Sequence, residues 1–319
     1  MYEIAGKQKE PMVMMIYGSP GIGKTTFASQ APNPVFIGDE LNKEFDFPKI
    51  IVANFNEVIK ALELVEKGKK YQDRKTIVID SISSLEDMLR HEIIKADPRG
   101  KEFASINQVH GGYGRGVDRM VFRTQALINK LKYMVEIGYN VIITCHSIKD
   151  TEEDATLLRT NVFYRPSLER KTLRIWEKWL PTILFARDKI ILDSESDKTK
   201  SLADQRVLYT QYRASHYAKN RYGLPFEVPL KGGVVKSLIK AKDKFYNKSP
   251  DGVDSTTSIM EARGAGATPA KGTKPDLAIE ELKAIYERIP ENKRPKVDWS
   301  LINSSNFKKS KDKLMELTK

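Results

Sequence analysis

Residues 18–25, with the sequence Gly-Ser-Pro-Gly-Ile-Gly-Lys-Thr, restrict the fold of this chain more than any other feature. They match the pattern G-x-x-x-x-G-K-[ST] and lie between an apolar run at residues 12–17 and a helix-forming segment at residues 25–30. A strand, a glycine-rich loop and a helix in this order can surround a phosphate group with backbone N–H donors. Glycine allows the inward turn because it lacks a Cβ atom. The sequence therefore predicts a nucleotide phosphate site.

Two side chains of this segment define the chemistry that it can support. The ammonium group of Lys24 would reach the β- and γ-phosphates, and the hydroxyl group of Thr25 would bind Mg²⁺. A chance glycine-rich turn is the alternative, which the flanking strand and helix patterns disfavour. The predicted nucleotide-binding residues are Gly18, Ser19, Pro20, Gly21, Ile22, Gly23, Lys24, Thr25 and Thr26.

Strand and helix patterns alternate over the first half of the chain, which predicts an α/β fold. Short runs rich in β-branched residues occur at residues 12–17, 35–37, 76–79 and 140–144. Helical patterns lie between them at residues 56–67, 82–95 and 117–137. This alternation is typical of a mostly parallel central sheet with helices on both faces.

The pattern changes after His146. A polar stretch at residues 147–171 predicts a long loop, and residues 172–180 predict a helix. We expect the closely spaced strands that follow to pair antiparallel and to extend the sheet, at residues 183–185, 190–192 and 206–212. The polar segment 194–204 predicts an exposed hairpin tip, and a basic helix at residues 234–246 closes the domain.

The last quarter of the chain has a different composition, which predicts three parts. Residues 1–247 would form a single core domain, because this length can bury a full apolar interior. Residues 248–275 are rich in glycine, serine, threonine, alanine and proline, which predicts a flexible linker. Residues 276–319 are lysine-rich and begin with a helical period, so we expect a small basic helical C-terminal segment.

The charge balance indicates what kind of partner to expect. The formal net charge is +12 and the isoelectric point is near 9.4. Such a balance favours an acidic polymer as partner, although a basic surface without one is the alternative. The single cysteine, Cys145, excludes an internal disulfide framework and fits a reducing compartment. No apolar run approaches membrane-spanning length, so we expect a cytoplasmic protein with no membrane partner.

Acidic residues follow two of the predicted strands. Asp80 ends the apolar run 76–79, where it could hold Mg²⁺ together with Thr25. Glu40 follows a strand that we expect next to the phosphate strand, and it could there polarise an attacking water. Asp39 could take this role instead, and either acid could be a solvated loop residue.

Three further residues are candidates for sensing or stabilising phosphate charge. His146 ends the run 140–144, where it could sense a γ-phosphate or could be a buried, hydrogen-bonded histidine. Lys219 and Arg221 are two positions apart, so on an extended segment they point the same way. They could stabilise transition-state charge, although the spacing alone favours contact with a phosphate backbone or with solvent.

The ordered set of motifs resembles the RecA-like ATPase family. Residues 18–25 match its Walker A loop, and residues 76–81 match its Walker B strand, including the Asp-Ser ending. Phe36-Ile-Gly-Asp-Glu40 is similar to the family's Phe-Ile-x-x-Glu motif, and Lys219-Asn-Arg-Tyr-Gly223 is similar to the Lys-Asn-Arg-Phe-Gly motif of RadA. The resemblance covers residues 12–246. It is strongest to compact phage-encoded RecA-like proteins, which anneal single strands or assist recombination.

The resemblance implies a role for each of these residues. Glu40 would activate water, and His146 would replace the family's glutamine-type sensor of the γ-phosphate. Lys219 and Arg221 would act across a subunit boundary on the ATP of a neighbouring copy, in a ring or a filament. Lys24 would complete the set of catalytic residues, Thr25 and Asp80 would serve Mg²⁺, and ATP would be the nucleotide.

The family also binds DNA through two loops that face the axis of the assembly. The first would be residues 97–116 and the second residues 147–171. Cations with nearby aromatic side chains suit single strands, because phosphates need positive charge and exposed bases need flat partners. Packing of these aromatic side chains onto their own core is the alternative. The predicted DNA-binding residues are Arg99, Lys101, Tyr113, Arg115, Arg159, Tyr164, Arg165, Arg170 and Lys171.

These implications predict an ATP-dependent single-stranded DNA-binding protein that acts in phage-type recombination or annealing, in the host cytoplasm. It would hydrolyse ATP with Mg²⁺ and DNA stimulation, as a homo-oligomer. The C-terminal segment could bind a single-strand-binding protein or DNA itself. Two other classes remain open, namely a helicase or helicase loader and a nucleotide-dependent scaffold that binds no nucleic acid. The positive charge disfavours the scaffold.

Overall fold

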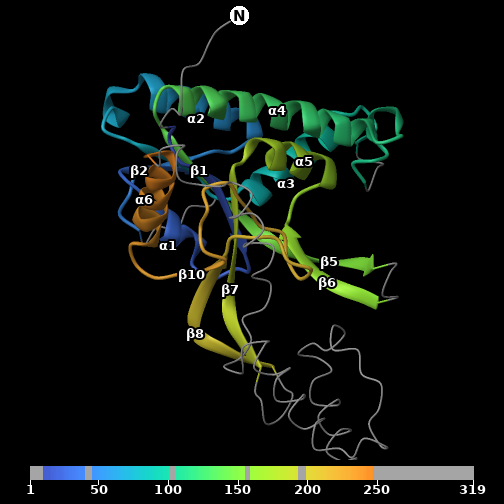
Figure 1. Ribbon diagram of the computed structural model, residues 1–319. Coiled ribbons are helices and arrows are strands. Elements are labelled where there is room, and N and C mark those ends of the chain that lie inside the picture. The colour runs from blue at the N-terminus through green and yellow to red at the C-terminus, as the bar shows by residue number, and fades with distance from the viewer. Residues whose placement is uncertain (1–9, 40–44, 101–104, 155–158, 193–198, 248–319) are drawn as a thin grey trace, which may run out of the picture. The chain divides into compact units, whose positions relative to one another are not determined.

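The computed structural model describes residues 10–39, 45–100, 105–154, 159–192 and 199–247 (Figure 1). Contacts divide the chain into two units, Met1–Lys248 and Ser249–Lys319. The predicted linker at residues 248–275 and the predicted C-terminal segment at residues 276–319 lie outside the described residues.

The elements of the described core alternate as the sequence predicts. The strands are β1 (Val13–Gly18), β2 (Pro34–Gly38), β3 (Lys49–Ile51), β4 (Thr76–Ile79), β5 (Asn140–Asp154), β6 (Arg159–Pro166), β7 (Thr182–Leu192), β8 (Thr199–Tyr209), β9 (Lys219–Asn220) and β10 (Glu227–Pro229). The α-helices are α1 (Lys24–Ser29), α2 (Phe55–Lys67), α3 (Ile82–Lys95), α4 (Arg115–Glu136), α5 (Arg170–Trp179) and α6 (Val234–Asn247). Two short 3₁₀ turns are η1 (Lys69–Tyr71) and η3 (Val109–Gly111).

These strands form one mixed sheet in the order β10-β8-β7-β1-β5-β4-β2-β3. The strands from β7 to β3 in this order pair parallel, and β8, β9 and β10 add antiparallel pairs at one side. The predicted α/β fold, a mostly parallel sheet with an antiparallel extension, is therefore confirmed.

Helices cover both faces of the sheet (Figure 1). Successive strand residues alternate between two apolar clusters, so that Met15 and Ile37 pack under α2, α3, α4 and α5. Met14 and Phe36 pack on the opposite side with residues of α1 and α6. Because strand side chains alternate with a period of two, fully apolar strands such as β1 need this double cover.

The strand β1 is shorter than both of its neighbours at the carboxyl end. Its last residue, Gly18, pairs with His146 of β5 and with Ala186 of β7, and both of these strands run on. A Cβ atom at Gly18 would lie 2.5 Å from the Ala186 carbonyl oxygen, so only glycine fits there. The phosphate loop therefore begins in a notch between two longer strands.

The polar stretch at residues 147–171 was wrongly predicted as a loop. β5 continues to Asp154 and pairs antiparallel with β6, from Ser147 opposite Pro166 outward. α5 also begins at Arg170 instead of Thr172. The hairpin escaped prediction because it leaves the sheet and loses the apolar alternation of a strand with one buried face.

The later strands also differ from the prediction. The predicted strands 183–185 and 190–192 are one strand, β7, which pairs parallel with β1 and antiparallel with β8. β8 ends at Tyr209 and begins at Thr199, so residues 199–204 belong to a strand and not to a hairpin tip. The short strands β3, β9 and β10 were not predicted.

The position of β2 corrects a second expectation. β2 pairs with β4 and β3, and the strands β4 and β5 separate it from β1. The strand that precedes Glu40 is therefore not next to the phosphate strand. It is next to the strand that ends in Asp80.

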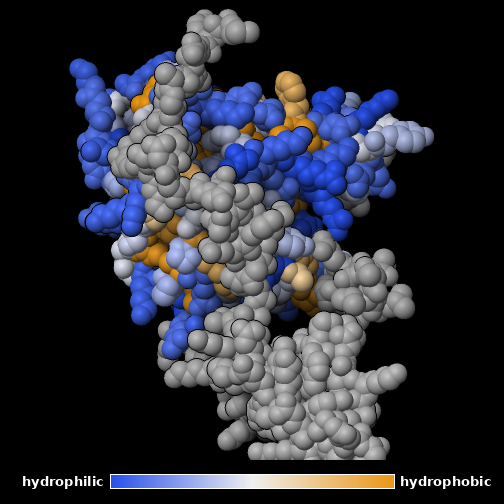
Figure 2. All heavy atoms as spheres, viewed as in Figure 1, coloured by the Kyte–Doolittle hydropathy of each residue, from blue (hydrophilic) through white to orange (hydrophobic). Residues whose placement is uncertain are grey.

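The surface of the described core is mainly hydrophilic in the view of Figure 2, with hydrophobic side chains visible between polar ones. In the described part of the chain, no helix combines the length and the apolar character needed to cross a membrane.

One buried carboxylic acid joins α3 to the start of α5. Glu86 is 4% exposed and accepts hydrogen bonds from the Thr172 hydroxyl and the Glu169 backbone N–H. Burial raises the pKa of Glu86 from 4.5 to about 7, because it disfavours the charged carboxylate. As the pH rises between these values, the unfolded chain releases its proton before the folded chain does. The free energy of unfolding therefore falls through this window.

Replacing Glu86 with glutamine should remove this pH dependence, because an amide does not titrate. Denaturant titrations of both proteins between about pH 4 and pH 8 measure the effect. The stability of E86Q relative to the natural protein should rise by about 3 kcal/mol over this range. If the free energies of unfolding of the two proteins differed by the same amount at every pH, Glu86 would have its ordinary pKa in the folded protein.

Candidate nucleotide-binding site

The loop between β1 and α1 has the backbone that the glycine spacing predicts. Gly21 and Gly23 have φ angles of 76° and 101°, which side chains other than glycine rarely adopt. α1 begins immediately afterwards at Lys24. The loop thus turns back on itself at the edge of the sheet where β1 ends.

Lys24 is held inside this loop. Its side chain is buried, and Nζ donates hydrogen bonds to the carbonyl oxygens of Gly18 at 3.1 Å and Ser19 at 2.9 Å. Burial lowers the pKa of Lys24 from its ordinary value, while Asp80 raises it again. The ammonium group is therefore positioned by carbonyl oxygens of the loop itself.

Thr25 and Asp80 lie together, as the sequence predicts. Thr25 Oγ1 donates a hydrogen bond of 2.8 Å to Asp80 Oδ2, and the Thr144 hydroxyl donates to Asp80 Oδ1. Three strands thus meet here, because β1 precedes Thr25, β4 precedes Asp80 and β5 carries Thr144. The pair offers a hydroxyl and a carboxylate oxygen, which are ligands that Mg²⁺ prefers.

A cavity of about 430 Å³ opens over this pair. Its floor is the phosphate loop, and its walls come from the ends of β2, β4 and β5. The lining residues are Pro20, Gly21, Gly23, Lys24, Thr25, Thr26, Asp39, Phe45, Asp80, Ser81, Ser84 and His146.

Asp39 lines this cavity, whereas Glu40 lies outside the described residues. One Asp39 oxygen accepts a hydrogen bond from the Ser84 hydroxyl in the first turn of α3. Sequence reasoning missed Ser84, because nothing in its local pattern distinguishes it from other helix residues. The choice between Asp39 and Glu40 as the water-activating acid stays open.

His146 lines the same cavity from β5. Its backbone N–H donates to the Ser83 hydroxyl, while its buried Nδ1 has no hydrogen-bond partner among the described residues. Burial and the nearby Lys24 charge lower the pKa of His146, so the ring is neutral at pH 7. A buried ring nitrogen without a partner beside the phosphate loop is suited to a ligand contact. The neighbouring Cys145 is fully buried, and burial raises its thiol pKa to about 12, which leaves it a core residue.

Lys219 and Arg221 do not line the cavity of their own chain. β9 pairs with the first residues of β7, Thr182 and Ile183, whereas the phosphate loop lies beside Ala186. Lys219 Nζ donates to the Glu177 carbonyl oxygen, and Arg221 is exposed. Burial lowers the pKa of Lys219, and repulsion by Arg221 lowers it further.

Arg206 of β8 lies against the outside of the phosphate loop, and sequence reasoning missed it. Its Nη1 donates a hydrogen bond of 3.5 Å to the Ile22 carbonyl oxygen. A Cβ atom at Gly23 would lie 3.5 Å from the same Nη1. No sequence motif marks this contact, because the two residues are 184 positions apart.

The donor set fits a magnesium nucleotide. The loop amides and Lys24 would hold the phosphates, and Thr25 and Asp80 would hold Mg²⁺. His146 Nδ1, buried without a hydrogen-bond partner among the described residues, could contact the same ligand. When bound, Mg²⁺ would neutralise charge on the phosphate oxygens.

The first predicted DNA-binding segment, residues 97–116, has side chains that make few polar contacts with the described core. Tyr113 is fully exposed on a turn between two glycines, and Arg115 is exposed at the start of α4. Arg115 makes no ion pair with any residue of the described core. The Arg99 backbone N–H donates to Asp97, and Lys101 lies outside the described residues.

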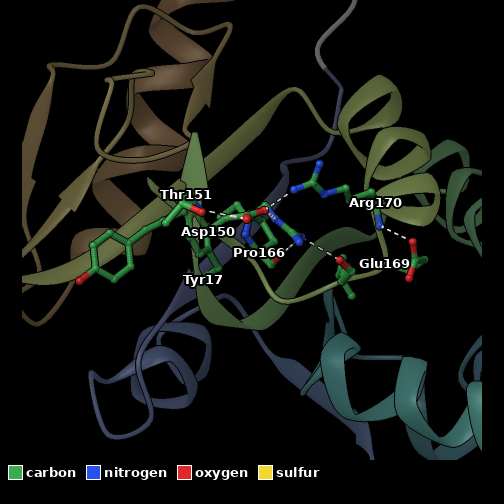
Figure 3. A network of polar contacts seen from close by, with 9 residues as sticks. Tyr17, Asp150, Thr151, Pro166, Glu169 and Arg170 are labelled. Atoms are coloured by element: carbon green, nitrogen blue, oxygen red, sulfur yellow. Dashed lines mark hydrogen bonds and ion pairs between the residues drawn. The ribbon is translucent and has the colours of Figure 1, made fainter. Parts of the chain in front are cut away.

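The cations of the second predicted DNA-binding segment, residues 147–171, form several ion pairs (Figure 3). Asp150 Oδ2 accepts from Arg165 at 2.8 Å and from Arg170 at 2.9 Å, which ties the hairpin to α5. Lys171 pairs with Asp118 at 2.7 Å. Tyr164 stacks on Phe185, and its backbone accepts a hydrogen bond from the Tyr17 hydroxyl.

Arg159 belongs to β6, but its side chain is outside the described residues. Phe163 of the same strand is buried, so this ring packs within the core.

This fold and site define a P-loop nucleoside triphosphatase domain. Its phosphate loop follows the central strand β1, and its acidic strand β4 is separated from β1 by β5. The family model described as "AAA domain" matches residues 10–222, about two thirds of the chain. The chain therefore belongs to this family and contains an AAA-type ATPase domain. No curated protein matches the chain.

Replacing Lys24 with alanine should strongly weaken nucleotide binding, because the only cation inside the described loop would be lost. We expect affinity for ATP to fall about a hundredfold, since two charge-assisted hydrogen bonds contribute ~3 kcal/mol. Isothermal titration calorimetry measures this loss. K60A, which removes an exposed lysine from α2, is the matched control and should bind ATP normally. Equal affinities of both variants would exclude this cavity as the nucleotide site.

Proposed function

We propose that this protein is a Mg²⁺-dependent ATPase that binds single-stranded DNA and assembles with copies of itself, as in phage-type recombination or annealing. The observation that carries the proposal is the phosphate loop with Lys24, the Thr25–Asp80 pair and His146 around one cavity. Each of these groups has a place in ATP binding or hydrolysis.

The acid that follows β2 supplies the hydrolytic step in this proposal. Asp39 lines the cavity, and Glu40 follows it directly, so one of the two carboxylates would accept a proton from the attacking water. Lys24 and the loop amides stabilise charge that develops on the phosphate oxygens. The hydroxyl of Ser84 would hold Asp39 in place.

The position of Lys219 and Arg221 supports assembly. Both cations lie away from the phosphate loop of their own chain, at the opposite end of the β7 pairing. Arg221 is exposed and makes no ion pair with any described residue, so it is available to a second copy. In the proposal, Arg221 enters the cavity of a neighbouring copy and stabilises transition-state charge there.

The continuity of β5 supports a link between nucleotide and DNA. His146 faces the cavity, and the same strand continues through Asp150 into the hairpin with β6. A ligand contact at His146 could therefore bias the hairpin without an intervening loop. The net charge of +12 favours a nucleic acid as the ligand of that hairpin.

Mixing two inactive variants tests the assembly directly. Arg221→Ala should retain ATP binding and lose DNA-stimulated hydrolysis, because the cation acts on a neighbour. The second variant removes the water-activating acid, as Glu40→Gln or, if that variant still hydrolyses ATP, as Asp39→Asn. It should lose hydrolysis at its own site and still offer its Arg221 to others. Mixtures should therefore recover part of the activity of the natural protein, measured as phosphate release with single-stranded DNA.

An absence of recovery at every mixing ratio would place Arg221 in its own site or outside catalysis. Lys178→Ala, which removes a cation from the last turn of α5, is the control for the loss of positive charge. This variant should hydrolyse ATP at the natural rate.

A further inference from the structure

A groove between α3 and α4 forms a second cavity, outside the nucleotide site. Its volume is about 550 Å³. Ile93 of α3 and Ala96, directly after this helix, form an apolar side. α4 contributes Phe122, which is 77% exposed. Hydrophobic side chains interrupt the hydrophilic surface along the upper edge of Figure 2, where α4 runs. A phenylalanine this exposed beside an apolar groove is suited to a flat or apolar ligand.

Two of the cations that line this groove have no acidic partner among the described residues. Arg115 and Arg119 lie one helical turn apart on α4, both exposed, and neither pairs with an acid among the described residues. By contrast, Arg165 and Arg170 share Asp150, and Lys171 pairs with Asp118. Arg115 and Arg119 of α4 thus have no acidic partner in the described part of the chain, whereas Arg165, Arg170 and Lys171 each have one.

The acids in the groove do not cancel this charge. Glu92 accepts an ion pair from Arg123 at 2.9 Å, and Asp118 accepts one from Lys171. With these pairs formed, Arg115 and Arg119 carry the excess charge of the rim. Both lie on the same face of α4 as Phe122, because Arg119 is three residues and Arg115 seven residues before it.

We propose that this groove binds one unstacked base of a single-stranded nucleic acid, with Phe122 as its stacking partner. Arg119 and Arg115 hold the phosphates on either side, and the exposed Tyr113 provides a second flat surface just before α4 begins. This inference rests on the proposed function and names the surface that performs the DNA binding. Arg119, Phe122 and the α3 wall are additions to the residues predicted from the sequence.

The arrangement favours a base over an acidic peptide. Alternating cations and exposed aromatic rings match the alternation of phosphates and bases along a single strand. The apolar wall formed by Ile93 and Ala96 offers no hydrogen-bonding side chain to a base edge. The groove therefore accepts bases without sequence preference.

Base stacking and phosphate contacts can be distinguished by comparing the binding of oligothymidylate with that of an abasic strand of equal length. Labelled strands are titrated with the full chain, a non-hydrolysable ATP analogue and Mg²⁺, and binding is followed by fluorescence anisotropy. Phe122→Ala should lower the affinity for oligothymidylate about tenfold and leave the affinity for the abasic strand unchanged. Phe122→Trp should retain the preference for bases. Arg119→Glu should weaken both strands and lower the salt slope by about one.

Matched controls lie on exposed positions outside the groove. L64A on α2 truncates a half-exposed apolar side chain, and K132E reverses an exposed cation on the same helix as Arg119. Both controls should bind the two strands like the natural protein. If Phe122→Ala and Arg119→Glu behave like the controls while the natural protein binds DNA, the inference fails and the proposed function stands.

Two other outcomes overturn the inference for different reasons. If the natural protein binds neither strand even at low salt, the proposed function itself fails. If a glutamate-rich peptide containing phenylalanine binds the natural protein but not Phe122→Ala, and no preference for bases exists, the groove belongs to a protein partner.

Discussion

The end of β1 at Gly18, beside two strands that continue, is the constraint on which the rest of the site depends. The Ala186 carbonyl oxygen leaves no room for a side chain at this point, so the chain turns away as a glycine-rich loop. The turn then delivers Lys24 to the loop interior and Thr25 to Asp80. A longer β1 would fill the notch in which the phosphate cavity lies.

The two strands that extend beyond β1, namely β5 and β7, connect this cavity to the rest of the molecule. β5 carries His146 at the cavity and Asp150 a few residues further, where one carboxylate holds Arg165 and Arg170. β7 continues into the hairpin with β8, and Arg206 of β8 returns to the outside of the phosphate loop. The hydroxyl of Tyr17, directly before Gly18, reaches the backbone of β6. Nucleotide site and hairpins are therefore parts of one bonded unit.

The sequence predicted the elements whose signals are local. The loop at residues 18–25, the α/β alternation and the meeting of Asp80 with Thr25 follow from motif spacing and from parallel strands ending at one edge. Strand order was less predictable, because nothing in the segment before Glu40 says which strand lies beside it. The ion pairs of Arg165 and Lys171 depend on residues distant in sequence, so their cations looked free until the fold was known. The groove beside Phe122 needs two helices and has no signal in either alone.

The central claim is that a triphosphate bound by the loop lies at the boundary between two copies of the chain. Electron microscopy of the full chain with a non-hydrolysable ATP analogue, Mg²⁺ and single-stranded DNA tests it most directly. The account predicts a ring or filament in which Lys219 and Arg221 of one copy face the Gly18–Thr25 loop of the next. Isolated monomers, or assemblies whose nucleotide cavities lie away from every subunit boundary, would contradict it.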